Sequence, residues 1–273
     1  MAIITISREL AALGDETAQE LAKVLDYRFV GKHILEERIK SYGINDEKLK
    51  KYDERKPSFF ASLSRDRDDY LHYLKTAMYA EAQTGNCIFI GRGAGAVFRN
   101  LPGHISMFLA APLDIRIERV KSYFHCDERR ARQIIERSDQ DRSGFHRYFF
   151  DIDWKDSGNY HLSLNTGIFY PSASAGIVKH FKDQFFTPET EEKNTARLGE
   201  LILGQQVKHH ILHERTIPIH FLEVSVSDGI ATLSGVANTQ SLIDAAVEAA
   251  SETAGSVTVR NEIQIIQEYS VIP

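Results

Sequence analysis

The sequence predicts an α/β protein with a five-stranded parallel sheet and flanking helices, followed by a small α+β unit of order αββαβ. In the first two-thirds of the chain, short apolar runs alternate with longer stretches of helical periodicity, a pattern typical of βα units. Continuous apolar runs such as ISMFLA at residues 105–110 indicate strands covered on both faces. After Pro188 the sequence becomes polar and acidic, which indicates a boundary before a second unit.

Five short segments are expected to form the parallel sheet. Each is followed by, or separated from the next by, helix-like sequence, and parallel neighbours need such crossover connections. The expected strands are Ile3–Ser7, Tyr27–Val30, Cys87–Gly91, Ile105–Ala110 and His161–Asn165.

The second unit is expected to begin with an amphipathic helix at residues 195–214. Strands at 220–227 and 230–234 follow, joined at Asp228-Gly229, a dipeptide whose tolerance of positive φ favours a tight hairpin. An alanine-rich helix near 239–253 and an alternating strand after Gly255 complete the unit. We therefore expect domains at residues 1–187 and 195–270, joined by a linker at 188–194.

Composition and charge exclude several classes of function. The chain of 273 residues is 42% hydrophobic and 26% charged, which is typical of a globular protein. A net charge of −5 gives no general attraction to nucleic acid, so no nucleic-acid partner is expected. No apolar run approaches the length of a membrane span, and charges interrupt the first 20 residues, so neither a transmembrane segment nor a signal peptide is expected. Two distant cysteines, Cys87 and Cys126, suit a reduced cytoplasmic protein.

Residues 3–24 read as a strand, a turn and an amphipathic helix, the layout of a phosphate-binding loop. Such loops use glycines, whose backbone N–H groups can point at the anion, and a lysine near the transferred phosphate. Here RELAALGDET keeps only Gly14 and has no lysine; depending on the alignment, either Gly14 or Asp15 stands at the lysine position. Asp15 and Glu16 also have a simpler interpretation, since acidic residues in the first turn stabilise a helix dipole.

Several blocks of the first 185 residues together resemble the cytidylate kinase-like family of P-loop proteins. They are ITISRE at the start, NCIFIGRGAGAVF, HISMFLAAPLDIRIERV, IIERSDQDRSGFHRYFFDIDW and YHLSLNTGIF. The resemblance implies a P-loop NTPase-like nucleoside monophosphate kinase fold, with a loop after the first strand for ATP phosphates, a helical monophosphate-binding insert and an arginine-bearing lid. It also implies ATP and Mg²⁺ as cofactors if the protein is active, and a nucleotide or other small phosphorylated ligand as partner.

The resemblance assigns candidate site residues block by block. The family's SR…G loop implies a cofactor-binding set of Ser7, Arg8, Gly14, Asp15, Glu16 and Thr17. The GRG block implies a substrate-binding set of Gly91, Arg92 and Gly93, in which Gly93 replaces a sugar-recognising Asp, so cytidine specificity is not implied. The lid block implies Asp139 and Arg142 as catalytic residues, followed by Asp153 and Trp154, and Arg137 of the same charge-rich region is a further catalytic candidate.

Each candidate also has a structural alternative. Arg92 follows a strand at the carboxyl edge of the expected sheet, where ligands bind, but an arginine there can also tie down an acidic neighbour. The region holding Arg130, Arg137, Arg142 and Arg147 can form a lid or simply a solvated helix face. No acidic residue ends CIFIG, so Mg²⁺ would be carried mainly by nucleotide and water. His209 and His213 lie one helical turn apart, but no further nearby ligands complete a zinc site, and no metal site is expected.

The pattern FLEVSVSDGIATLSGVANTQSLIDAAVEAA…GSVTVRNEIQII resembles the BON domain. The match depends on a DG turn, the LSG after the second strand, the alanine-rich helix and a V-x-N-x-I ending, carried by Asp228, Gly229, Gly235, Gly255 and Asn261. The resemblance implies a non-catalytic module that binds a small ligand or mediates self-association.

Two hypotheses about the whole chain remain open. Arg92 and the lid arginines favour an ATP-dependent phosphotransferase with a degenerate Walker A loop and a regulatory tail. The loss of the glycines and the lysine, with Asp15 and Glu16 in their place, favours a catalytically inactive kinase-like protein that senses a ligand or signals.

Overall fold

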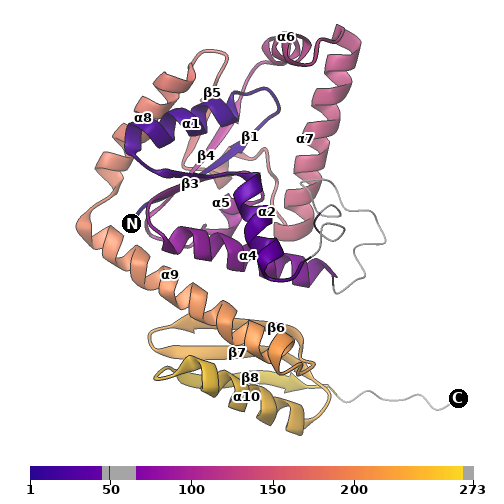
Figure 1. The fold of residues 1–273 in the computed structure, drawn as a ribbon, viewed down its shortest axis with the longest axis vertical. Helices are drawn as coiled ribbons and strands as arrows, with labels where there is room; N and C mark the ends of the chain where they lie inside the picture. Colours follow the sequence, from indigo (N-terminus) through magenta and orange to yellow (C-terminus); the bar gives the residue numbers. More distant parts are fainter. Residues whose placement is uncertain (45–48, 50–65, 267–273) are drawn as a thin grey trace, which may run out of the picture. The chain divides into compact units, whose positions relative to one another are not determined.

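The computed structural model describes residues 1–44, 49 and 66–266. The chain divides into two compact units, Met1–Asn194 and Thr195–Pro273 (Figure 1). None of the helices in the described part of the chain is long and apolar enough to cross a bilayer.

The first unit contains a five-stranded sheet, as predicted, in which every neighbouring pair is parallel and the order is β2-β3-β1-β4-β5. Each expected strand is present, with ends that differ from the expected ones by at most one residue. The strands are β1 (Ile3–Arg8), β2 (Arg28–Val30), β3 (Cys87–Ile90), β4 (His104–Ala110) and β5 (Leu162–Asn165).

Helices cover both faces of this sheet (Figure 1). On one face lie α1 (Gly14–Leu25) and α8 (Pro171–Phe185), which pack side by side. On the other face lie α4 (Asp66–Gln83) and the short α5 (Ala94–Val97), with α2 (Lys32–Ser41) packed against α4. After β4 come α6 (Leu113–Phe124) and α7 (Glu128–Phe150), which pack together, and then the 3₁₀ turn η2 (Ser157–Asn159).

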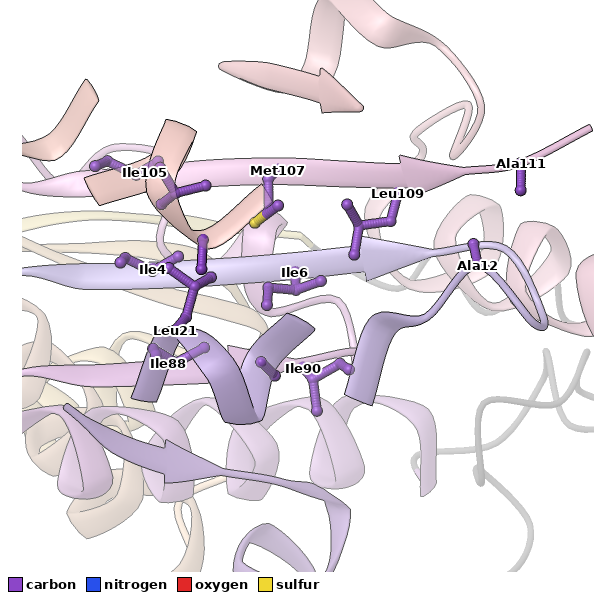
Figure 2. Packing of buried hydrophobic residues seen from close by; sticks show 13 residues of the cluster. Ile4, Ile6, Ala12, Leu21, Ile88, Ile90, Ile105, Met107, Leu109 and Ala111 are labelled. Atoms are coloured by element: carbon purple, nitrogen blue, oxygen red, sulfur yellow. The ribbon is translucent and has the colours of Figure 1, made fainter. Parts of the chain in front are cut away.

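The main hydrophobic core lies between the sheet and the pair α1 and α8. Alternate residues of three strands point to this face, and Figure 2 shows their aliphatic side chains converging on Leu21 of α1. Burial of one such side chain stabilises the fold by about 1.5–3 kcal/mol, so this face fixes the register of the strands. The strand residues are Ile4, Ile6, Ile88, Ile90, Ile105, Met107 and Leu109.

The second unit has the predicted αββαβ order. Helix α9 (Pro188–His209) contains the boundary between the units and starts at Pro188, so residues 188–194, where a linker is expected, are helical. The expected domain limits remain a prediction. After the π-helical turn η3 (His210–Glu214), β6 (His220–Ser227) and β7 (Ile230–Ala237) form an antiparallel hairpin. Asp228 and Gly229 have φ of 52° and 74°, as the predicted turn requires.

The remaining elements of the second unit close its core. Helix α10 (Gln240–Ala254) begins at the N-cap Thr239, and β8 (Thr258–Ile265) pairs with β7 in parallel. Alanines of α10 pack closely on Leu233 and Ile263 of the sheet, which explains the alanine-rich sequence.

Candidate functional site

The loop between β1 and α1 has a left-handed backbone at two positions that lack glycine. Ala11 has φ 60° and Leu13, the N-cap of α1, has φ 54°. This region of φ costs a non-glycine residue about 1 kcal/mol or more. The turn expected of a phosphate-binding loop is therefore present, and contacts elsewhere must hold it.

Two arginines of α6 provide these contacts by binding loop carbonyls. Arg116 Nε donates to Leu10 O at 2.8 Å, and Arg119 Nη1 donates to Ala11 O at 2.9 Å. Arg119 Nη2 also donates to Thr166 O at 2.7 Å, which links the loop to the segment after β5. Burial lowers the pKa of Arg119, and the carboxylate of Glu16 opposes that shift. These bonds turn the carbonyls of Leu10 and Ala11 toward α6.

A buried ionic network continues from Arg116 to α7. The guanidinium Nη1 lies 3.1 Å from Glu9 Oε2, and Nη2 lies 2.6 Å from Asp139 Oδ2. Asp139 Oδ1 accepts the backbone N–H of Leu10 at 3.1 Å, and Lys155 Nζ lies 3.0 Å from Glu9 Oε1. Because the two carboxylates are almost fully buried, they depend on these cations and donors for compensation. The network joins the loop, α6 and α7.

The N-terminus of α1 opens toward this loop. No side chain caps the helix, and the first N–H groups of an α-helix have no intrahelical acceptor, so this end attracts anions. Gly14 is the first helical residue, and a Cβ there would lie 2.6 Å from Arg8 Cγ. The glycine therefore makes room for the Arg8 side chain at the start of the helix.

Three further members of the predicted cofactor-binding set lie in the first turn of α1. Asp15 and Glu16 are exposed. Thr17 is buried, and its hydroxyl donates to Leu13 O at 2.7 Å. Ser7, at the end of β1, is also buried. A role for these residues in binding a nucleotide remains a prediction.

The predicted substrate-binding block follows β3 at the same edge of the sheet, where Gly91 N–H donates to Ile6 O at 3.0 Å. Arg92 is only 2% exposed, and its guanidinium contacts Glu36 Oε1 at 2.6 Å and Tyr70 Oη at 3.0 Å. Gly93 has φ 71°, and a Cβ there would lie 2.1 Å from Phe150 Cε2. Only glycine fits this position, which gives a physical reason for the absence of an Asp.

The predicted lid residues lie on α7, and the structure brings one of the three, Asp139, into contact with the loop. Asp139 bonds to the loop directly, as described above. Arg142 Nη1 lies 4.0 Å from Asp139 Oδ1 and donates to Ser138 Oγ at 2.5 Å. Arg137 is exposed, and it forms no hydrogen bond or ion pair with any residue that the structure describes. Arg130 and Arg147 are exposed as well.

The sequence model of the cytidylate kinase-like family matches residues 3–168. The chain belongs to the cytidylate kinase-like family. A cytidylate kinase from Sulfolobus acidocaldarius is 37% identical over 94 residues, which are 34% of this chain and 50% of that protein. The cytidylate kinase-like chain thus spans about half the length of this curated relative. The sequence model of the BON domain matches residues 200–267.

A solved structure agrees with the fold of the cytidylate kinase-like unit. An uncharacterized protein from Eubacterium ventriosum superposes with a TM-score of 0.53 at 20% identity, over 67% of this chain and 99% of that protein. Shikimate kinase from Bacteroides thetaiotaomicron gives a TM-score of 0.40 at 13% identity, over 67% of this chain and 98% of that protein.

Sequence reasoning missed the residues that hold the loop of this cytidylate kinase-like chain. Glu9, Arg116, Arg119 and Lys155 were not among the candidates, although two local signals exist. Arg116 and Arg119 are three residues apart in DIRIER, so they share a face of the helix after β4. Lys155 directly follows the DW dipeptide, and its Nζ lies 5.8 Å from the centre of the Trp154 ring.

The donor set near the loop fits Mg²⁺ only in part. Mg²⁺ prefers one or two carboxylates together with substrate phosphates and waters. Asp15 and Glu16 offer exposed carboxylates at the start of α1, whereas the Thr17 hydroxyl is turned inward. In this cytidylate kinase-like chain Asp15 and Glu16 would therefore hold a nucleotide-bound Mg²⁺, which would neutralise phosphate charge there.

Proposed function

We propose that this cytidylate kinase-like chain binds a nucleotide through residues 8–17 and acts as an ATP-dependent phosphotransferase on a nucleotide or other small phosphorylated acceptor. The observation that carries the proposal is the left-handed backbone at Ala11 and Leu13, in a loop whose carbonyls at Leu10 and Ala11 are bound by Arg116 and Arg119. A strained conformation persists only where surrounding structure maintains it, and such strain clusters at ligand sites. With the carbonyls of Leu10 and Ala11 bound to α6, the open end of α1 is available to a phosphate.

Other cations take over the role of the missing lysine in this proposal. The Lys155 side chain is half-exposed, and its Nζ pairs with Glu9 at the solvent-facing edge of the ionic network. Arg8 lies at the start of α1, and Arg142 lies on α7 within 4.0 Å of Asp139, the residue that contacts the loop. Phosphoryl transfer depends mainly on charges placed around the transferred group, so the position of a cation matters more than its place in the sequence.

The proposed reaction is an in-line transfer of the γ-phosphate of ATP to the acceptor. The acceptor phosphate attacks the γ-phosphorus of ATP in line, the bond to the β,γ-bridging oxygen breaks, and ADP leaves with the electron pair. Arg142 and Lys155 stabilise the charge on the equatorial oxygens. Arg92, at the same edge of the sheet, binds the acceptor after exchanging its contact with Glu36.

A second candidate function, ligand sensing without turnover, is favoured by a different observation. Arg92 and Asp139, two of the family's expected site residues, are already engaged inside the protein. The exposed carboxylates of Asp15 and Glu16 also repel a triphosphate. In this alternative the loop holds a ligand, and no phosphate is transferred.

The two candidates are separated by measuring binding and turnover on the same samples. Thermal unfolding is followed with ATP, ADP and CMP, each with and without Mg²⁺. A ligand at 100 times its Kd raises the free energy of unfolding by about 2.7 kcal/mol. Binding with acceptor-dependent release of ADP supports the phosphotransferase, and binding without release supports the sensor. No stabilisation by any of these nucleotides contradicts the phosphotransferase and a sensor of nucleotides.

A matched pair of glycine variants assigns the binding to the loop. Gly14→Ala places a methyl group against Arg8, so we expect nucleotide affinity to fall. Gly176→Ala, in the middle of α8 with no atom within 4 Å of the added Cβ, provides the control and leaves affinity unchanged. Equal affinities in the two variants would remove the start of α1 from the site.

The BON domain is inferred to be the non-catalytic partner of the kinase-like unit, acting either in small-ligand binding or in self-association. Sedimentation of the full chain over a wide concentration range decides between them. A monomer at all concentrations excludes self-association.

The cytoplasm is the location that suits a nucleotide-dependent protein with two free cysteines.

A further inference from the structure

One face of the sheet in the first unit is aliphatic, whereas the other carries a polar patch among buried apolar residues such as Ile3 and Phe89. Opposite the aliphatic residues of Figure 2, β1 and β4 carry Thr5, Ser7, His104 and Ser106, all buried. Polar side chains in the middle of a buried sheet destabilise it unless they are hydrogen-bonded. A polar patch at this place therefore needs an explanation.

The side chains of this patch are hydrogen-bonded in pairs, and one buried ring nitrogen is left without a partner in the described part of the chain. Thr5 Oγ1 lies 2.7 Å from His104 Nε2, while His104 Nδ1 has no partner among the described residues although the side chain is almost fully buried. His161 Nδ1 accepts the backbone N–H of Ser106 at 2.9 Å, so the proton of its neutral ring is on Nε2. Buried polar groups are rarely left unpaired, and each exception points to a missing partner.

A hollow of about 290 Å³ opens over this network. Its walls come from α5 and the turn after it, from the start of β4, and from residues 158–161 before β5. Arg99 lies on its rim, where Nη2 donates to Asn159 Oδ1 at 3.1 Å. No aspartate or glutamate is among the described residues that line it: Gly95, Arg99, His104, Ser106, Gly158, Asn159, Tyr160 and His161.

The hollow therefore offers donors and a positive charge with no carboxylate among its described lining residues, although Asp153 and Asp156 lie near Tyr160 on one side. Burial lowers the pKa of His104 to about 3, assisted by His161 and Arg99, and burial also lowers the pKa of His161. Both rings are neutral near pH 7, so the charge comes from Arg99 and the histidines contribute polar N and N–H groups. A guanidinium with neutral donors is the arrangement that binds oxyanions.

We propose that this hollow is a second ligand site, which binds the phosphate or carboxylate group of a small metabolite through Arg99, His161 and the His104 wall. It is separate from the β1–α1 loop. His104 and His161 lie at the amino-terminal ends of β4 and β5, whereas the loop follows the carboxyl end of β1, and these strands are parallel. The proposal does not depend on the proposed nucleotide site.

The test uses the full chain with ¹⁵N-labelled histidine rings, titrated with inorganic phosphate and separately with acetate at constant ionic strength. We expect saturable shifts of the His161 and His104 ring nitrogens. Arg99→Gln should weaken the binding about 10- to 100-fold, the worth of a charge-assisted contact. Arg147→Gln, an exposed arginine of α7 that does not line the hollow, is the matched control and should bind as the wild type does.

The two titrations distinguish a phosphate ligand from a carboxylate ligand. Shifts with phosphate alone support a phosphorylated metabolite, and shifts with acetate support a carboxylate. Gly14→Ala should leave these shifts unchanged even where it weakens nucleotide binding, because the two sites are separate. No shift with either anion, equal affinity in Arg99→Gln, or loss of the shifts in Gly14→Ala would overturn the proposal.

Discussion

Replacing Arg116 by methionine tests whether the ionic network holds the β1–α1 loop in shape. Methionine keeps most of the buried aliphatic stem but removes the guanidinium, which contacts Glu9, Asp139 and the Leu10 carbonyl. Removing one partner of a buried ion pair costs about 3–5 kcal/mol, because the remaining carboxylates stay buried without compensation. For a unit of this size, that loss lowers Tm by roughly 6–20 °C.

The assay is urea unfolding followed by tryptophan fluorescence. Trp154 is the single tryptophan of the chain and is fully buried in the first unit, so its emission reports that unit alone. Arg132→Met is the control, since Arg132 pairs with Glu128 on the surface of α7 and such pairs contribute about 0–1 kcal/mol. If Arg116→Met and Arg132→Met change the free energy of unfolding equally, the network does not hold the loop.

Three further predictions follow, two on stability and one on ATP binding. Gly93→Ala should destabilise the first unit by about 2–4 kcal/mol, because of positive φ and the clash with Phe150; a stability near that of the wild type would contradict this. Because burial lowers the pKa of His104 to about 3, the unfolded state binds more protons than the folded state between pH 3 and about 6.5. The free energy of unfolding should therefore fall by about 2 kcal/mol from pH 7 to pH 5. His104→Gln should show a clearly smaller fall, with the remainder coming from other groups such as His161, and a pH profile unchanged from the wild type would refute the assignment. Lys155→Met should weaken ATP binding about tenfold in a calorimetric titration, whereas Lys23→Met, at the far end of α1, should not.

The sheet could be predicted from the sequence because its signal is local. Ile4 and Ile6 on β1, with Ile105, Met107 and Leu109 on β4, already show which residues share the buried face. The hairpin turn at residues 228–229 was predictable for the same reason, since the DG dipeptide itself tolerates positive φ. Long-range partners were not needed for either prediction.

The conformation of the phosphate-loop region could not be predicted in this way. Glycines are normally the signal for left-handed backbone, and Ala11 and Leu13 have that backbone without being glycine. The loop that contains them is bound at the Leu10 and Ala11 carbonyls by Arg116 and Arg119, which are more than a hundred residues away in sequence. The loop sequence therefore shows that glycines are absent at positions 11 and 13, but it does not indicate that Arg116 and Arg119 bind the loop instead.

The candidate site was predictable in outline but not in its internal contacts. The family blocks located Arg92 and Asp139, and the structure places both at the loop end of the sheet. It also gives them protein partners that no local pattern indicates, because Glu36 and Tyr70 reach Arg92 across 56 and 22 residues of sequence.

The most direct test of the nucleotide proposal is an amide NMR titration of the full chain with ATP and Mg²⁺. The account predicts saturable shift changes that are largest at the backbone amides of Ala11, Leu13, Gly14, Asp15 and Glu16, where the open end of α1 meets the loop. Unchanged amides at these positions under saturating nucleotide, or the largest changes elsewhere in the chain, would contradict it.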